Sequence, residues 1–436
     1  MTDSPNPSPS RRAVIKTAAA ASTLALGPQV FGSARPVATD PEVLRIGLVG
    51  CGGRGSGAAL NALRAEEGTV MLTAVADVFP ERIESCLSNL KNSLGEGAGR
   101  VAVEPEQRFT GFDAYKKLLA TDIDVVLLAT PPGFRPEHLK AAVAADKHIF
   151  TEKPMAVDAP GIRSVYATAK EAKRKNLNLA SGFCWRKNIR HRAWFEELHS
   201  GRIGEVRAFH STYNASPLGT HKRQPEWSDM EFQLKNWHHF NWISGDHIVE
   251  QACHSLDKQN WAMGDRPPLS ATAVGGRQVH RGEERGNIFD HFGVTYDYGD
   301  GVMAFHQSRQ MPNCDFENND YVFCEKGHGI INGWAPLHLL AGGDDEWVYD
   351  GPGNDMYQQE HDELFAAIRA GEVVDDGGFM TTSSMLSIMG RMSAYTGKTI
   401  TWEQAMASEE KLGPERHAWG PVPVPPVPVP GTTQFT

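Results

Sequence analysis

Two clusters of residues in this sequence have the types and spacing needed for chemistry on an alcohol. In the first, Thr151-Glu152-Lys153-Pro154, a lysine closely follows the apolar segment 148–151. The proline after Lys153 restricts the lysine backbone to extended conformations and so limits where the ammonium group can lie. A lysine at the carboxyl end of a parallel strand points into the crevice where such sheets bind ligands. We therefore expect Lys153 to hold a substrate oxygen, the alternative being an exposed ion pair with Glu152.

The second cluster lies in segment 245–257, where Glu250 and His254 are four residues apart. A helix would place both side chains on one face. Histidine exchanges protons near neutral pH, so His254 beside a carboxylate suits the base that takes a hydroxyl proton as hydride leaves the adjacent carbon. A buried structural histidine is one alternative. A metal held by His247, Glu250 and His254 is another, but the spacing is not H-E-x-x-H, and we predict no metal.

A glycine-rich loop, Gly50 to Gly55, fits the pattern G-x-G-x-x-G between an apolar strand and a helix. Asp77 follows about twenty residues later, where an acidic residue binds the adenosine ribose. Asp77 would repel a 2′-phosphate and so favours NAD, whereas Arg54 could neutralise that phosphate and leaves NADP open. A flavin would use the same loop. The predicted cofactor-binding residues are Gly50, Gly52, Gly53, Arg54, Gly55, Asp77, Thr130, Pro131, His138, Glu152 and Lys153.

Aromatic residues beside polar donors predict a sugar-binding surface, because the C–H faces of a sugar stack on rings and its hydroxyls need partners. An aromatic core between two domains is an equally good interpretation of each tryptophan. The predicted substrate residues are Trp185, Arg186, Trp237, His238 and Asp257.

The elements that must position these residues alternate between apolar strands and helices. This order predicts an α/β fold: a doubly wound Rossmann sheet with helices on both faces, over residues 43–160. The expected strands are 44–49, 70–76, 125–129 and 148–151, and the expected helices 58–65, 112–119 and 136–145.

Residues 161–412 predict a second, α+β domain with a large, mostly antiparallel open sheet. Its expected helices are 162–173 and 191–198, and its expected strands 177–183, 206–213, 269–279, 291–298 and 301–310. Tyr298-Gly299-Asp300-Gly301 predicts a hairpin turn. The proline-rich segment 413–436 predicts an extended surface tail.

The N-terminus predicts export. Arg11 and Arg12 precede an apolar stretch and then small residues, which resembles a twin-arginine signal peptide over 1–34, followed by a linker over 35–42. We expect an exported, for example periplasmic, protein with no stable membrane anchor, carried by the twin-arginine machinery. The net charge of −10 argues against nucleic-acid binding. Six scattered cysteines predict mostly free, buried thiols.

Together these motifs resemble the Gfo/Idh/MocA family of glucose–fructose oxidoreductase, inositol dehydrogenase and relatives. The resemblance runs from Leu44 to Met406. It rests on the glycine loop, Thr130-Pro131, Glu152-Lys153-Pro154 and the Glu250/His254 pair, together with Ile203-Gly204-Glu205-Val206 and the C-terminal Gly390-Arg391, Thr396-Gly397-Lys398 and Trp402. It implies a lysine acting with an acid and a histidine near the hydride-transfer centre, and dimers or tetramers built on the open sheet. Glu250 stands where the family usually has Asp, which leaves its role open.

We therefore expect an NAD(P)-dependent oxidoreductase acting on a CH–OH group of a sugar, polyol or glycoside. Because no dissolved NAD pool exists outside the cytoplasm, the cofactor is expected to be held tightly and recycled within each turnover. A redox-neutral NAD-dependent glycosidase and a non-catalytic exported sugar-binding protein are the alternatives.

Overall fold

Six strands, all parallel, form the first sheet in the order β3-β2-β1-β4-β5-β6. The computed structural model describes residues 43–66, 68–334, 338–343 and 345–436, so the expected signal peptide and linker lie outside the described residues. The strands are β1 Val43–Val49, β2 Thr69–Asp77, β3 Arg108–Thr110, β4 Val125–Leu128, β5 His148–Thr151 and β6 Leu179–Ser181. The order reverses between β1 and β4, which opens a crevice at the carboxyl ends of these two strands.

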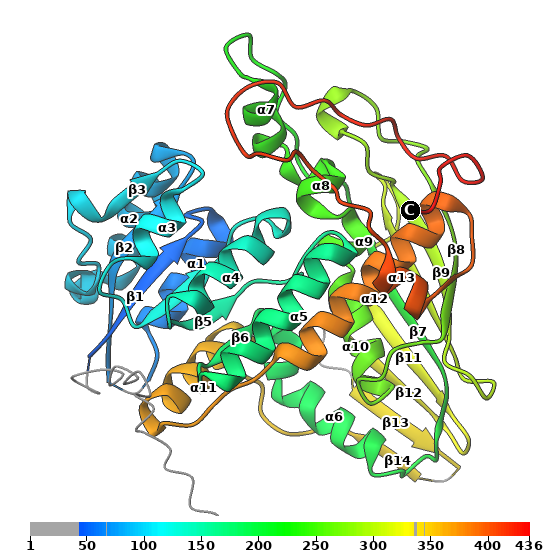
Figure 1. Cartoon of the computed structure of the whole chain (residues 1–436). Coiled ribbons are helices and arrows are strands. Elements are labelled where there is room, and N and C mark those ends of the chain that lie inside the picture. Colours follow the sequence, from blue (N-terminus) through cyan, green and yellow to red (C-terminus); the bar gives the residue numbers. More distant parts are fainter. Residues whose placement is uncertain (1–42, 67, 335–337, 344) are drawn as a thin grey trace, which may run out of the picture. The chain divides into compact units, whose positions relative to one another are not determined.

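Helices cover both faces of this sheet, as expected of continuous apolar strands (Figure 1). One face packs against α1, α2 and α11, and the other against α3, α4 and α5. The helices are α1 Gly53–Leu63, α2 Pro80–Leu94, α3 Ala114–Leu119, α4 Arg135–Ala144, α5 Ala159–Arg174 and α11 Met356–Ala370. Helix α2 was not expected, although its buried residues Ile83, Cys86, Leu87 and Leu90 have helical spacing.

The expected domain boundary at residue 160 is too early. Strand β6 was expected to belong to the second domain, but it pairs in parallel with β5, Ile149 lying opposite Leu179. Helix α11, far along the chain, also returns to the first sheet, where Leu364 and Phe365 are fully buried. The first domain is therefore built from chain segments that come before the strands of the second sheet and from α11, which follows strands β7 to β14 in the sequence.

Nine strands form the second sheet, in the order β14-β13-β12-β11-β7-β10-β9-β8-β15. Neighbouring strands are antiparallel except β7 and β10, which are parallel, so the antiparallel assignment of segment 206–213 holds on only one of its sides. The predicted hairpin connects β9 and β10. The strands are β7 Val206–Ala215, β8 Ser270–Gly276, β9 His291–Asp297, β10 Met303–Gln310, β11 Asn319–Cys324, β12 His328–Asn332, β13 His338–Gly342, β14 Asp345–Val348 and β15 Ile400–Thr401; β11 to β14 were not expected.

One face of this sheet is covered by helices α10 and α12, whose apolar residues share a core with the sheet. The remaining helices of the chain are α6 Ile189–His199, α7 Asp229–Lys235, α8 Asn241–Ser244, α9 His247–Glu250, α10 Cys253–Ala262, α12 Gly377–Thr396 and α13 Trp402–Ala407. The short 3₁₀ helices are Gly95–Arg100, Pro105–Gln107, Pro132–Phe134, Cys184–Lys187, Trp237–His239 and Glu283–Arg285. Among the described residues, no helix is both long and apolar enough to cross a membrane.

The tail after α13, drawn in red in Figure 1, has no regular helix or strand. It passes α7 and α8 and then returns toward the end of α12. Val422 is buried, whereas Val424 and Val429 are exposed. The tail is therefore a packed surface segment rather than a free extension.

Candidate active site

The glycine loop joins β1 to α1 by a turn that only glycine permits at two positions. Gly50 has φ +97°, and a Cβ there would lie 2.8 Å from the backbone of Ala129 and Thr130. A Cβ on Gly55 would lie 1.8 Å from the carbonyl oxygen of Gly50. At Gly53, by contrast, a Cβ would meet nothing within 4 Å. The loop is thus closed toward the protein and open toward the crevice, which leaves the N–H groups at the start of α1 exposed to a ligand.

A cavity of about 890 Å³, hereafter the cleft, extends from this loop to the second domain. All the predicted catalytic and cofactor-binding residues line it, as do Trp237 and His238. The lining residues predicted from the sequence are Gly50, Gly52, Gly53, Arg54, Gly55, Asp77, Thr130, Pro131, His138, Glu152, Lys153, Trp237, His238, Glu250 and His254.

Asp77 ends β2 beside the glycine loop. Its carboxylate accepts hydrogen bonds from the backbone N–H of Cys51 at 2.7 Å and of Phe79 at 2.9 Å. Burial raises the pKa of Asp77, and these two N–H groups oppose that effect. Two bonds use about half of the acceptor capacity of a carboxylate, so Asp77 can still accept from the hydroxyls of a ribose.

Arg54 does not face the cleft as a free cation. Its guanidinium forms ion pairs with Glu152 and, at 3.0 Å, with Glu360 on α11. Burial alone would raise the pKa of Glu152, but Arg54 lowers it, whereas burial raises the pKa of Glu360. Both carboxylates thus engage the Arg54 guanidinium, which leaves little of its charge for a 2′-phosphate. Arg82, which also lines the cleft, is not in an ion pair among the described residues.

Lys153 follows β5, and its peptide bond to Pro154 is cis. Its Nζ donates to the backbone oxygen of Glu250 at 2.5 Å and lies 3.3 Å from the carboxylate Oε1 of the same residue. Burial would lower the pKa of Lys153, but Glu250 raises it above the ordinary lysine value. The group is therefore an ammonium with three N–H donors, of which Glu250 takes two, and the third can bind a ligand in the cleft.

Glu250 and His254 lie on two short helices rather than on one. Helix α9 ends at Glu250 and α10 begins at Cys253, with a turn between them. The Glu250 carboxylate contacts Lys153, and no hydrogen bond joins it to His254 among the described residues. The expected orientation of the imidazole by a carboxylate is therefore not seen; the ring of His254 packs 5.2 Å from that of Trp185 instead.

The imidazole of His254 is neutral. Burial lowers its pKa well below the ordinary histidine value, and the nearby Lys153 ammonium lowers it further. A neutral imidazole beside an ammonium is a proton acceptor next to a hydrogen-bond donor. This pair can bind one hydroxyl and deprotonate it.

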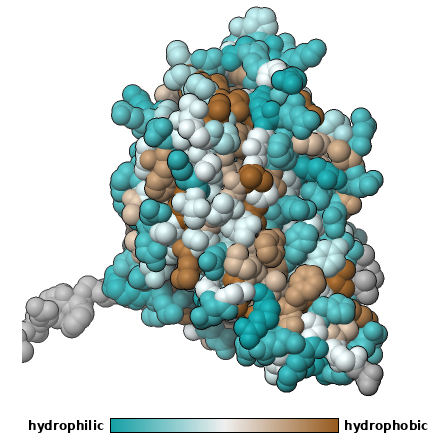
Figure 2. Space-filling view, turned by 90° about the vertical axis from the view of Figure 1, so that its right-hand side faces the viewer, coloured by the Kyte–Doolittle hydropathy of each residue, from teal (hydrophilic) through white to brown (hydrophobic). Residues whose placement is uncertain are grey.

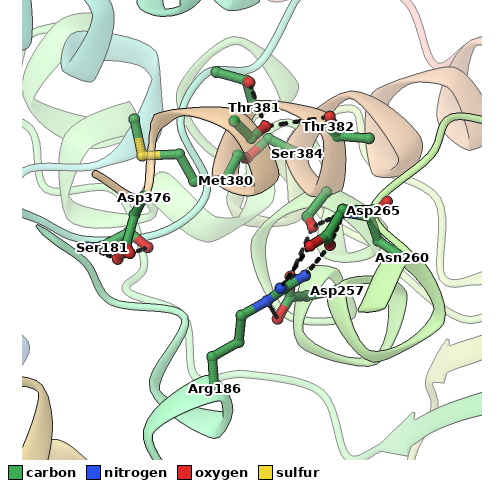
Figure 3. Close-up of polar contacts among 12 residues, drawn as sticks. Ser181, Arg186, Asp257, Asn260, Asp265, Asp376, Met380, Thr381, Thr382 and Ser384 are labelled. Atoms are coloured by element: carbon green, nitrogen blue, oxygen red, sulfur yellow. Dashed lines mark hydrogen bonds and ion pairs between the residues drawn. The ribbon is translucent and has the colours of Figure 1, made fainter. Parts of the chain in front are cut away.

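Arg186, Asp257 and Trp185 are not among the cleft residues. Arg186 pairs with Asp257 at 2.9 Å and with Asp265 at 2.5 Å, and Asn260 also contacts Asp265 (Figure 3). The side chain of Asp257 is almost fully buried, and Trp185 is 2% exposed. These three residues thus lie outside the cleft lining, and the ion pairs of Arg186 connect the middle of α10, at Asp257, to the turn after the helix, at Asp265.

The alternative metal constellation is not assembled. His247 contacts Asp246 at 3.1 Å and packs against Phe292, away from Glu250. Within the described ranges, no three histidine, cysteine or acidic side chains are grouped closely enough to hold a metal ion.

Sequence reasoning missed several residues at the cleft. The buried Arg135 donates to the carbonyls of Thr130 and Pro154, and so holds together the loops that follow β4 and β5. It directly follows the Thr130–Phe134 loop, but an arginine at the start of a helix is too common to signal this. Other missed cleft residues are Phe79, Arg82, Phe112, Tyr115, Phe134 and Tyr357.

A parallel sheet in this strand order, a glycine loop at its reversal point and a second domain with an open sheet define a two-domain dehydrogenase fold. Two models of one family match this chain: the oxidoreductase family with the NAD-binding Rossmann fold over residues 44–179, and the GFO/IDH/MocA C-terminal domain over residues 191–328. Together they cover more than half of the sequence. The chain belongs to the GFO/IDH/MocA oxidoreductase family, and its first domain is an NAD-binding Rossmann domain.

Several of the relatives are named for sugars or polyols. The dTDP-3,4-didehydro-2,6-dideoxy-alpha-D-glucose 3-reductase of Saccharopolyspora spinosa is 31% identical over 40% of this chain and 47% of its own. The inositol 2-dehydrogenase of Rhizobium meliloti is 24% identical over 74% of this chain and 86% of its own length. The chain matches about half of the length of the first curated relatives. A levoglucosan dehydrogenase, solved with NADH and levoglucosan, shares the fold with a TM-score of 0.65 and 17% identity over 82% of this chain and 99% of that chain.

Proposed function

We propose that this chain is an NAD-dependent oxidoreductase that acts on a CH–OH group of a sugar or polyol. The observation that carries the proposal is the convergence of the glycine loop, Lys153 and His254 on one cleft. Bound NAD would supply the hydride acceptor. The open space at Gly53 and the spare acceptor capacity of Asp77 fit its pyrophosphate and ribose.

The chain's own residues would then act on the substrate hydroxyl. Lys153 donates a hydrogen bond to the carbinol oxygen and stabilises negative charge that develops there. Neutral His254 accepts the hydroxyl proton as the carbon loses hydride. Glu250 positions the ammonium by taking two of its three donors. In the reverse direction, the same groups return the proton to a ketone.

The preference for NAD over NADP rests on Asp77. A carboxylate at this place repels a 2′-phosphate, and Arg54, engaged by Glu152 and Glu360, is poorly placed to offset it. Arg82 also lines the cleft, so it is the cation that could offset the repulsion of a 2′-phosphate by Asp77.

A sugar or polyol is favoured by the polar and aromatic groups at the second-domain end of the cleft. Trp237 and His238 stack at 3.7 Å and both line the cleft. Burial lowers the pKa of His238, so its neutral ring can donate to and accept from hydroxyls. The relatives named for inositol, levoglucosan and a deoxyglucose support the same substrate class.

The experiment is a panel of polyols, aldoses and glycosides offered to the purified chain with NAD, with NADH formation, either free or as one equivalent bound to the chain, followed by absorbance. Polyol- or sugar-dependent NADH formation supports the proposal. Glycoside cleavage that needs NAD but yields no net NADH would indicate the redox-neutral glycosidase. Sugar binding with neither activity would indicate a binding protein and overturn the proposal.

We also propose that the chain is exported by the twin-arginine route with its cofactor already bound, and that it recycles this cofactor in each turnover. Twin-arginine cargo crosses the membrane folded, and an exported dehydrogenase has no dissolved NAD pool to draw on. Dinucleotide that stays bound in stoichiometric amount through extensive dialysis would support this. A cofactor lost during dialysis would contradict it.

A homodimer or homotetramer is the third part of the proposal. The second sheet's face opposite α10 and α12 carries exposed apolar side chains, including Val274, Phe305 and Phe323. Figure 2 shows hydrophobic side chains, in brown, dispersed among polar ones on the side of the molecule where this sheet lies. A second copy covering this face would remove them from water.

A further inference from the structure

The C-terminal tail is attached to the body of the protein before and after it reaches the cleft. The N–H of Leu412 donates to Asp158 at 2.9 Å, next to the start of α5. Further on, the N–H of Gly431 donates to the carbonyl of Thr396 at 2.9 Å, at the end of α12. The segment between these two bonds is therefore held at both ends.

Between the two attachments, the tail contacts one wall of the cleft. The ring of Trp419 lies 5.0 Å from that of Phe112 and 5.7 Å from that of Phe79. The ring of His417 lies 4.6 Å from that of Phe134. All three phenylalanines line the cleft and belong to loops of the Rossmann domain.

The next residues of the tail bind the opposite wall. The carbonyl of Gly420 accepts from the N–H of Met230 at 3.1 Å, and the carbonyl of Val422 accepts from the side chain of Gln233 at 2.7 Å. Met230 and Gln233 lie on α7. The same helix carries the cleft residue Leu234 and is followed by the cleft residues Trp237 and His238. Residues 417–422 thus join the two walls.

A separate apolar cluster surrounds this junction. It combines Rossmann-domain residues, residues of segment 230–243 and one tail residue, all buried: Phe79, Phe134, Met230, Phe232, Leu234, Phe240, Trp242, Ile243 and Val422. The ammonium of Lys235 lies 4.4 Å from the centre of the Phe79 ring and adds a cation–π contact across the same junction. Separating the walls would expose this cluster to water.

We infer that residues 413–422 form a latch that holds the cleft closed and slows the exchange of the dinucleotide. The inference rests on the proposed function, because it concerns release of the same cofactor. In this proposal the dinucleotide leaves when the two walls move apart, and that movement breaks the contacts of Trp419 and His417 with the Rossmann loops. Trp419 is 47% exposed, so substitution of its ring removes these contacts without disturbing the buried cluster itself.

The proline-rich segment 421–430 continues from the latch to the second attachment at Gly431. Proline fixes its own φ, so this segment has fewer conformations to lose when it packs than an ordinary chain of the same length. The cost of ordering the connection between the latch and α12 is therefore low.

The test uses the full chain loaded with NADH and measures the rate of NADH loss, by fluorescence, after mixing with excess NAD. The variants are Trp419→Ala, Trp419→Phe and the tail control Val429→Ala, which is exposed and lies beyond the junction. We expect Trp419→Ala to speed NADH release about tenfold, because it removes two aromatic contacts. Trp419→Phe keeps an aromatic ring, so it should release NADH at a rate much closer to that of the wild-type chain. Val429→Ala should release NADH at the wild-type rate.

A release rate unchanged by Trp419→Ala, or raised equally by Val429→Ala, would overturn the latch while leaving the proposed function intact. A wild-type chain that binds no NADH would overturn both. Thermal denaturation of each variant separates a local effect from general destabilisation, since loss of a half-exposed ring should leave the melting temperature almost unchanged. His417→Ala is the second variant, expected to speed release in the same direction.

Discussion

The charge and the direction of the Lys153 ammonium depend on its neighbour Glu250. An isolated lysine in a buried cleft would tend to lose its proton, but Glu250 on α9 raises its pKa and fixes its direction. Burial lowers the pKa of His254, and the same positive charge lowers it further. The Lys153–Glu250 pair therefore fixes the donor and favours the neutral form of the acceptor.

Replacing Lys153 by Met removes the charge at similar side-chain length. We expect kcat/KM for polyol oxidation to fall roughly 10²–10³-fold, the usual cost of one donor to a developing oxyanion, while NADH binding persists. Steady-state kinetics and fluorescence titration measure the two effects. Lys170→Met, on the exposed surface of α5, is the matched control and should leave both unchanged. Equal activity of the two variants would remove Lys153 from the chemistry.

The pH profile tests the base. Because burial and Lys153 lower the pKa of His254, the imidazole stays neutral as the pH falls through about 6.5, the usual histidine value. We expect kcat/KM for oxidation to be flat there and to fall only at lower pH. In Lys153→Met the ammonium no longer opposes protonation, so the acid limb should move to higher pH. An acid limb that stays in place in this variant would show that the titrating group is not beside Lys153.

At the scale of elements, the close approach of β1 and α1 depends on Gly55 but not on Gly53. A Cβ at Gly55 would collide with the backbone of Gly50, whereas one at Gly53 meets open space. We expect Gly55→Ala to lower the free energy of unfolding by about 1–3 kcal/mol or more through forced backbone shifts. Gly53→Ala should keep or slightly raise it, since alanine favours helices. Denaturant titration compares the two, and equal losses would argue against this packing of the loop.

The sequence predicted those elements whose signal is local. The strands β1, β2, β4 and β5 are continuous apolar runs, and the loop and Lys153 sit at their ends, so both the sheet and the cofactor side of the cleft could be predicted. The signal failed where pairing is non-local: β6 looked like the start of a new domain, and β7 gained a parallel neighbour, β10, about ninety residues later.

Side-chain direction also could not be read from spacing. A single helix would have placed Glu250 and His254 on one face, but α9 ends at Glu250 and α10 begins at Cys253, and the Glu250 carboxylate contacts Lys153 instead. Arg186 and Asp257, whose types suit a sugar site, instead form an ion pair with each other, Asp257 lying on α10. Residue type alone does not say whether a polar residue supports a site or faces its ligand, and here the fold distinguishes the two cases.

At the scale of the whole molecule, the two sheets differ in how many of their faces are covered by helices. The first is covered on both faces, whereas the second has helices on one face only. Across the other face, side chains at successive register positions lie in a row: Leu339, Ile330, Tyr321, His210, Phe305 and Thr295. Nine strands make this face roughly 40 Å wide, wide enough for the roughly 800 Å² per partner of a standard interface.

Phe305 lies on β10, the sixth of the nine strands, and is 40% exposed, so Phe305→Lys should fold normally while placing a charge near the centre of an interface on this face. An unpaired buried charge costs several kcal/mol, so we expect this variant to be a monomer of 47.8 kDa under conditions where the wild-type chain is a dimer or tetramer. Light scattering after size exclusion measures the mass, and Val429→Lys, in the exposed tail, is the control. If Phe305→Lys keeps the wild-type mass, the subunits associate through another surface, because a lysine in the middle of a covered sheet has no route to water.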